Sequence, residues 1–157
     1  MSIYGLGLIT KRGLTNRALL LVFLYAANEG KIAISSELLD SLVWLIQTGE
    51  VLPFYYQFHY NPSDQKPSSE SLSRDLNLCA IHQAVDRTQF IQITPKGKDW
   101  VEKEGKKRVE QFEDVLKIII ETLRFFTGMT ELQISQAIKT RIEKKSVLRG
   151  GPPWIPP

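Results

Sequence analysis

Hydrophobic residues in the first third of the chain follow a helical pattern. Residues 18–27 are almost all apolar, which is typical of a helix that is buried on every side. Thr15 is a typical N-cap and Gly30 a typical stop, so the pattern predicts a helix over residues 16–29. A second helix, capped by serine and ended by glycine, is predicted over residues 36–48 because its apolar residues cover one broad face.

The middle third mixes strand and helix signals. Residues 51–60 are aromatic and β-prone and predict an edge strand, while residues 61–67 have the composition of a loop. Apolar residues at positions i, i+4 and i+7 predict a third helix over residues 69–79. Two short β-prone runs, residues 81–85 and 89–94, are joined by a tight connection, which predicts a hairpin.

The last third carries the strongest helical periodicity. Thr94 as N-cap with Pro95 at the first helical position predicts a helix that extends as far as Phe126, with Gly97 and Gly105 as weak points. A final helix is predicted from Thr130, where Gln133 completes a capping box. Within the long helix, apolar residues step by three and four as in a coiled coil: Val109, Phe112, Leu116, Ile119, Leu123 and Phe126.

This apolar stripe has three interpretations. It could pack within the chain against the hydrophobic first helix. It could instead pair with the same helix of a second subunit, which would give a homodimer through residues 108–126. It could also belong to a surface for a protein partner, with aromatic residues such as Phe125 and Trp154 as anchors.

The predicted order of elements is helix, helix, strand, helix, hairpin, helix, helix. Three helices followed by a two-stranded wing is the winged helix-turn-helix arrangement, so we expect an α+β, mainly α fold. The predicted winged-helix domain covers residues 1–103, a C-terminal helical extension covers 104–145, and a Pro/Gly-rich tail covers 146–157. In DNA-binding proteins of this kind the helix before the wing, here residues 69–79, enters the major groove.

Several short segments resemble small prokaryotic winged-helix proteins of the Panacea and SocA-like antitoxin type. The segment Pro67–Leu76 is similar to their "GPYSxxLxxDL" helix, although Lys66 stands where that motif has glycine, and Ile93–Lys98 resembles "LTxxGK". The resemblance extends over residues 17–103 and includes Leu19–Gly30, Leu38–Gln47 and Phe54–Tyr60. It implies a module that binds DNA or recognises a protein partner, as an antitoxin or adaptor does, and it implies no cofactor.

Candidate contact residues lie on the third helix, at the wing and just after it. Arginine side chains suit guanine and asparagine side chains suit adenine, while lysine and arginine also neutralise phosphates. The third helix itself is not basic, because Glu70 and Asp75 outweigh Arg74. The candidates for binding DNA or a protein partner are Ser69, Ser73, Arg74, Asn77, Arg87, Lys96 and Lys98.

Composition restricts the possible chemistry. The 157 residues include one cysteine and two histidines, which excludes a disulfide framework and any multi-thiolate metal site. We expect Cys79 to be a buried, inert thiol and His82 to make only local hydrogen bonds. No stretch is long and apolar enough for a membrane span, and the start of the chain does not resemble a signal peptide, so we expect a cytoplasmic protein.

The net charge of +3 arises entirely in the last third, where residues 101–157 carry eleven basic and eight acidic side chains. A basic arm over residues 139–149 could be a solvated helix end or could bind an anionic partner. Taken together, the sequence predicts a non-enzymatic regulatory module without a cofactor. A transcription regulator that binds double-stranded DNA is favoured slightly over an antitoxin-like or adaptor module that binds a protein.

Overall fold

The computed structural model describes residues 14–149. These residues form a mainly helical fold with two small antiparallel sheets of two strands each, which confirms the expected α+β, mainly α class. The elements are α1 (Asn16–Glu29), α2 (Ser36–Thr48), β1 (His59–Asn61), β2 (Lys66–Ser68), α3 (Glu70–Ile81), β3 (Val85–Asp86), β4 (Gln92–Ile93), α4 (Pro95–Trp100), the π-helical turn η1 (Val101–Gly105), α5 (Lys106–Arg108), α6 (Phe112–Thr127) and α7 (Glu131–Arg149).

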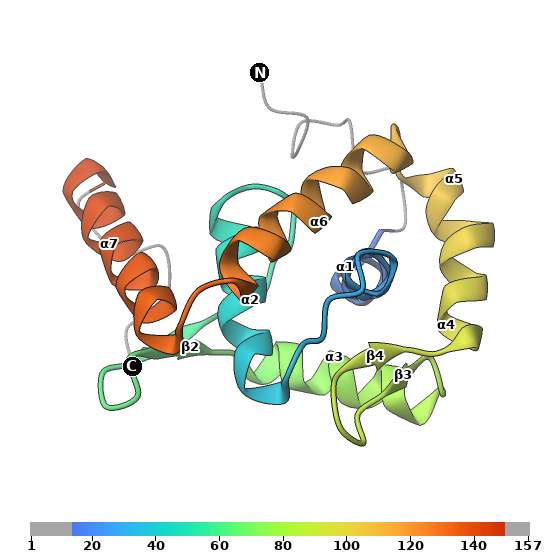
Figure 1. Ribbon diagram of the computed structural model, residues 1–157, viewed down its shortest axis with the longest axis horizontal. Coiled ribbons are helices and arrows are strands. Elements are labelled where there is room, and N and C mark those ends of the chain that lie inside the picture. Colours follow the sequence, from blue (N-terminus) through green and yellow to red (C-terminus); the bar gives the residue numbers. More distant parts are fainter. Residues whose placement is uncertain (1–13, 150–157) are drawn as a thin grey trace.

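Helix α1 lies at the centre of the molecule. Figure 1 shows it nearly end-on, with α6 above it, α4 and α5 to one side, α2 to the other, and α3 with the β3–β4 hairpin below. Because neighbours surround it, Leu20, Val22 and Phe23 are fully buried. The Thr15 hydroxyl oxygen accepts a hydrogen bond from the amide of Ala18 (3.2 Å), as expected of the N-cap. The prediction of an all-round buried helix over residues 16–29 is confirmed.

Gly30 and Gly49 follow the ends of α1 and α2, as the sequence predicted, but neither has the left-handed backbone that usually favours glycine at a helix end. Gly30 has a right-handed backbone, and the left-handed residue is the next one, Lys31 (φ 56°). The same arrangement recurs at Gly49 and Glu50 (φ 59°). A Cβ atom on Gly30 would lie 2.9 Å from Cγ2 of Ile120, so glycine is needed there for the close approach of α6 to α1.

The predicted strand over residues 51–60 is largely wrong. Residues 52, 54, 56 and 58 are buried while 55 and 57 are exposed, so the chain is extended, but no strand pairs with it between residues 51 and 58. The side-chain amide of Gln47 takes the place of a partner strand. It donates to the Tyr56 carbonyl (2.9 Å) and accepts from the Tyr56 amide (3.0 Å). Asn16 accepts from the amide of Tyr55 (2.8 Å).

A strand pair instead follows this segment. His59 to Asn61 pairs antiparallel with Lys66 to Ser68, with Tyr60 opposite Pro67. The predicted loop over residues 61–67 therefore ends in a strand. Gln65 adopts a left-handed backbone (φ 55°) in the turn, which lets the chain reverse direction within a few residues.

The β3–β4 pair confirms the predicted hairpin, but its strands are much shorter than predicted. Val85 pairs with Ile93, and the ladder has only two residues in each strand. The hairpin is fastened to the body through Ile91, whose amide donates to the Ile34 carbonyl (2.8 Å). Beyond it, Thr94 caps α4 as predicted.

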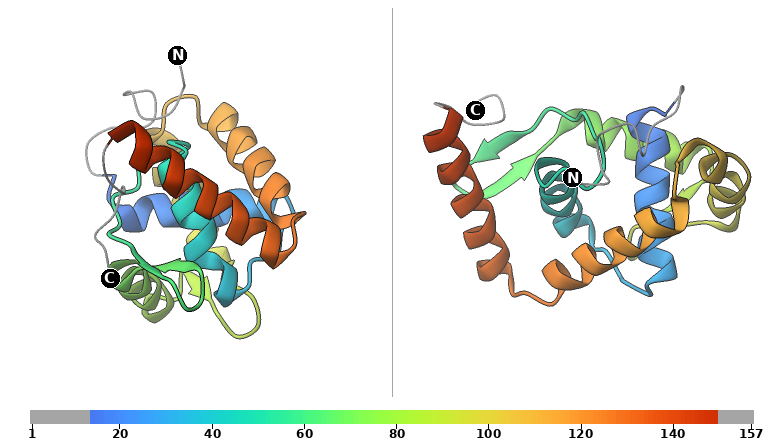
Figure 2. Two further views of the ribbon diagram at one scale, coloured as in Figure 1. Left: turned by 90° about the vertical axis from the view of Figure 1, so that its left-hand side faces the viewer. Right: turned by 90° about the horizontal axis from the view of Figure 1, so that it is seen from above.

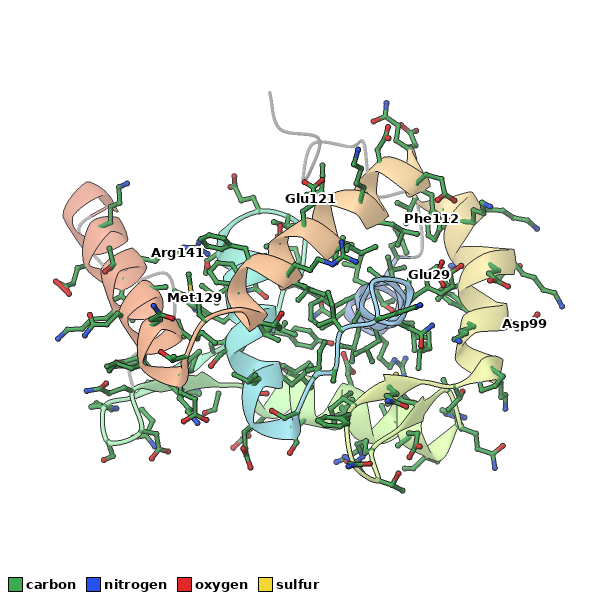
Figure 3. The ribbon with its side chains drawn as sticks, viewed as in Figure 1. Glu29, Asp99, Phe112, Glu121, Met129 and Arg141 are labelled. Atoms are coloured by element: carbon green, nitrogen blue, oxygen red, sulfur yellow. The ribbon has the colours of Figure 1, made fainter. Side chains whose placement is uncertain are left out.

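The single helix predicted from Pro95 to Phe126 is wrong. Helical turns continue only to Arg108, after which Val109 is extended and Gln111 is left-handed (φ 54°). Neither glycine nor proline marks this turn. The chain turns because α6 packs across α1, where the ring of Phe112 lies 5.9 Å from that of Tyr25 (centroid to centroid; Figure 3).

The apolar stripe predicted for dimerisation packs within the chain. All six of its side chains are at most 7% exposed in the single chain, where α6 packs across α1 and Val109 is buried in the turn before it. The structure therefore shows the intramolecular packing that was one of the three interpretations. The homodimer through Val109, Phe112, Leu116, Ile119, Leu123 and Phe126 stays a prediction, and these side chains leave little exposed surface for it.

Helix α7 forms an outer layer beside α2 (Figure 2). The predicted capping box is present: Thr130 and Gln133 exchange two hydrogen bonds of 2.9 and 3.1 Å. Arg141 points from α7 toward α2 (Figure 3) and donates to the Leu45 carbonyl and the Thr48 hydroxyl, both at 2.8 Å. The helix continues to Arg149, so residues 146–149 of the predicted tail are helical, and the rest lies outside the described residues.

Among the helices of residues 14–149, none has the length and hydrophobicity that crossing a membrane requires.

Candidate nucleic-acid interface

Helix α3 has one buried face and one solvent face. Leu72, Leu76 and Cys79 are at most 7% exposed and fasten the helix to the body. Ser73, Arg74 and Asn77 are exposed on the remaining surface. Three of the predicted contact residues therefore share the exposed face of one helix, as the spacing of the apolar residues implied.

Ser69 does not belong to this exposed face, although it was predicted there. It is the N-cap of α3 and is 3% exposed, and its hydroxyl accepts from the Leu72 amide (3.2 Å). Its own amide donates to the Asp40 carboxylate on α2 (3.2 Å). Burial raises the pKa of Asp40 above 3.8, and the hydrogen bond from Ser69 opposes part of that rise. Ser69 therefore positions α3 and is not available for contacts.

Asp75 also points toward the body. The Tyr56 hydroxyl donates to a carboxylate oxygen of Asp75 (2.8 Å), which ties α3 to the extended segment that Gln47 holds. Burial and the neighbouring carboxylate raise the pKa of the Tyr56 hydroxyl, so it stays protonated and remains a donor. Asp75 is half-buried, and the acidic group that remains exposed on α3 is Glu70.

The β3–β4 hairpin is joined to α3 by a predicted contact residue. The Arg87 guanidinium donates to the side-chain oxygen of Asn77 at 2.5 Å. Exposed polar side chains of the helix and the hairpin are therefore joined, and the ribbons of α3 and the hairpin lie along the lower edge of Figure 1. Asp86 at the hairpin is also exposed, and hydrogen bonds from Thr88 lower the pKa of its carboxyl, so it remains charged.

The two predicted lysines lie on α4, which begins where the hairpin ends. Lys96 is exposed, and Lys98 is half-buried. Gly97 between them is buried, since a Cβ atom there would meet the Ala84 carbonyl oxygen at 2.4 Å and Ile93 at 2.6 Å. This close approach fixes α4, and with it Lys96, against the base of the hairpin.

Two exposed apolar side chains flank the polar surface and were not among the predicted contacts. Ile81 at the end of α3 is 72% exposed, and Phe90 in the hairpin loop is 36% exposed. The spacing of the buried residues on α3 indicates that Ile81 is exposed, because Ile81 lies off their i, i+4, i+7 line. No local pattern indicates that Phe90 is exposed, because its neighbours have the composition of a strand.

Two further candidate groups, Cys79 and His82, lie on α3 and just after it. Cys79 is buried, and burial raises the pKa of its thiol to about 11, which keeps it in the unreactive protonated form at neutral pH. Within residues 14–149, no three His, Cys, Asp or Glu side chains come together as a metal site would require. His82 lies exposed just after α3.

Comparison of the chain with protein-family models, with curated proteins and with solved structures found no match.

Proposed function

We propose that the chain is a winged-helix DNA-binding regulator that places α3 in the major groove and the β3–β4 hairpin against the adjacent backbone. The observation that carries the proposal is the continuous polar surface of Ser73, Arg74, Asn77 and Arg87, in which the hydrogen bond from Arg87 to Asn77 joins helix to hairpin. The resemblance to winged-helix proteins over residues 17–103 points in the same direction.

The dimensions of α3 suit this role. Its 12 residues give a rod about 18 Å long, and the major groove is wide enough for one helix. Arg74 and Asn77 lie one turn apart on the exposed face, where they can approach base edges. If Asn77 reads a base, its hydrogen bond to Arg87 orients the amide before DNA arrives.

The charges of the surface predict weak electrostatic attraction. Arg74, Arg87 and Lys96 are exposed cations, while Glu70 and Asp86 are exposed anions nearby. With Arg74 at a base edge, Arg87 and Lys96 give about two phosphate contacts, so the logarithm of the binding constant should fall with the logarithm of salt with a slope near −2. Such a protein depends on base contacts or on avidity more than on charge.

The test is fluorescence-anisotropy binding of the full chain to pooled duplex DNA at several salt concentrations between roughly 50 and 200 mM. Arg87→Gln should weaken binding about tenfold and reduce the salt slope by about one. Lys117→Gln is the matched control, since Lys117 is an exposed cation on α6, and it should bind as the parent chain does. Absence of binding at the lowest salt, or equal loss in both variants, would overturn the proposal.

A second candidate function is recognition of a protein partner by the same surface, as in antitoxin-like or adaptor modules. Exposed Ile81 and Phe90 favour it, because apolar side chains beside cancelling charges are typical of protein interfaces. This function predicts a stable complex that Ile81→Ser weakens and that Arg87→Gln leaves unchanged. Size-exclusion chromatography of the chain with the candidate partner separates the two functions.

A further inference from the structure

An open cavity of about 340 Å³ lies between the first turns of α1 and the last turn of α3. Its wall comes from α1, α3, α4 and α5. Leu21, Leu78 and Trp100 line it and are each only half-buried. Three large apolar side chains that converge on one hollow leave apolar surface for a ligand to cover.

The same cavity gathers cationic and hydrogen-bonding groups. Arg17, His82 and Arg108 line it, and no Asp or Glu is among the described residues that do. The Cys79 thiol in its wall is protonated, as shown above, and adds no negative charge. Glu104 offsets the charge of Arg108, so Arg17 gives the described lining its net positive charge, which suits an anion.

Arg108 and Trp100 form one wall together. The guanidinium carbon of Arg108 lies 6.0 Å from the Trp100 ring centroid, and one of its nitrogens lies 3.4 Å from Glu104. Arg108 thus contributes its contact with the Trp100 ring to this wall.

We propose that this cavity binds a small organic anion with an apolar or aromatic body. Its carboxylate would lie against Arg17, His82 and Arg108, and its body against Leu21, Leu78 and Trp100. This combination of apolar walls with a few convergent donors is typical of small-molecule sites. The site is separate from the proposed DNA contacts, and the inference does not depend on them.

The experiment is isothermal titration calorimetry of the full chain, without DNA, using indole-3-acetate and its neutral analogue indole-3-acetamide. Indole-3-acetate should bind at one site, and the amide should bind about tenfold more weakly because it lacks the charge-assisted hydrogen bonds. Equal affinities for the two compounds, or no saturable heat with the acid, would overturn the proposal.

Variants locate the site. Arg17→Gln should weaken binding of indole-3-acetate about tenfold and leave the amide little changed. Leu78→Trp, which fills the hollow, should weaken both compounds. Lys117→Gln is the charge-matched control outside the cavity and should bind as the parent chain does, with circular dichroism verifying the fold of each variant. Unchanged binding in both cavity variants would place the ligand elsewhere and contradict the inference.

Discussion

Helix α6 and helix α3 both lie against the central helix α1, but different interactions hold them. The buried stripe of α6, the helix that packs on α1, is apolar and includes the fully buried Ile119 and Leu123. Helix α3 buries only three side chains, and polar contacts fix its position: Ser69 to Asp40 and Asp75 to Tyr56. Apolar burial therefore supports the scaffold, while directional hydrogen bonds orient the surface that we propose for DNA.

The largest effect should come from the apolar contact. Ile119→Ala should lower the free energy of unfolding by about 2–5 kcal/mol, because it removes buried methyl groups and leaves a cavity. Ser73→Ala, on the exposed face of α3, should change it by less than about 0.5 kcal/mol. Urea denaturation followed by circular dichroism measures both. Similar losses in the two variants would contradict the contrast between the regions.

The extended segment beside α3 should be next in sensitivity. Gln47→Leu removes both hydrogen bonds to the Tyr56 backbone and should cost about 1–3 kcal/mol, because that amide and carbonyl are left without their partner. The measurement is again urea denaturation. Gln47→Glu keeps an acceptor for the amide and should retain part of the stability. If Gln47→Leu left the free energy of unfolding unchanged, these two hydrogen bonds would not stabilise the extended segment.

Removal of the hydroxyl that holds Asp75 should have a smaller effect. Tyr56→Phe keeps the buried ring and loses one hydrogen bond, so the free energy of unfolding should fall by about 1 kcal/mol. Hydrogen exchange adds a local test, since the amides of α3 should exchange faster while those of α6 stay protected. Equal acceleration in both helices would mean that the hydroxyl supports the whole fold.

The smallest effect concerns pH. Burial raises the pKa of Asp40 in the folded chain above 3.8, so the folded state binds this proton more tightly than the unfolded state. The contribution of Asp40 to the free energy of unfolding is therefore fully present below pH 3.8 and is lost as the pH rises through its raised pKa. Asp40→Asn should remove that dependence, and its stability relative to the parent chain should increase with pH across this window in urea titrations. If the difference in the free energy of unfolding between Asp40→Asn and the parent chain did not change with pH, the raised pKa of Asp40 would be contradicted.

The sequence predicts well where local signals decide the structure. Thr15 and Thr94 cap their helices as expected, and the capping box at Thr130 is present, because a cap depends on residues only three positions apart. The exposed face of α3 follows from its buried line for the same reason. These features needed no knowledge of distant contacts.

Prediction fails where a distant contact decides. The pattern of residues 51–58 is that of a strand, but the partner is the Gln47 side chain, which no local pattern reveals. The turn at Gln111 contains no glycine or proline that would indicate it in the sequence. It accompanies the packing of α6 on α1, which is distant in the sequence. The site shows the same limit: Ser69 was predicted as a contact, but its burial depends on Asp40, 29 residues earlier.

We propose that the exposed surface of α3 and the hairpin, rather than α6 or α7, contacts DNA. Amide chemical-shift mapping of the full chain with a duplex compares these regions in one experiment. Perturbations should concentrate on the exposed positions of α3 and on residues 86–90, with α6 and α7 unchanged. Perturbations that cluster on α7, or that spread evenly over the chain, would contradict it.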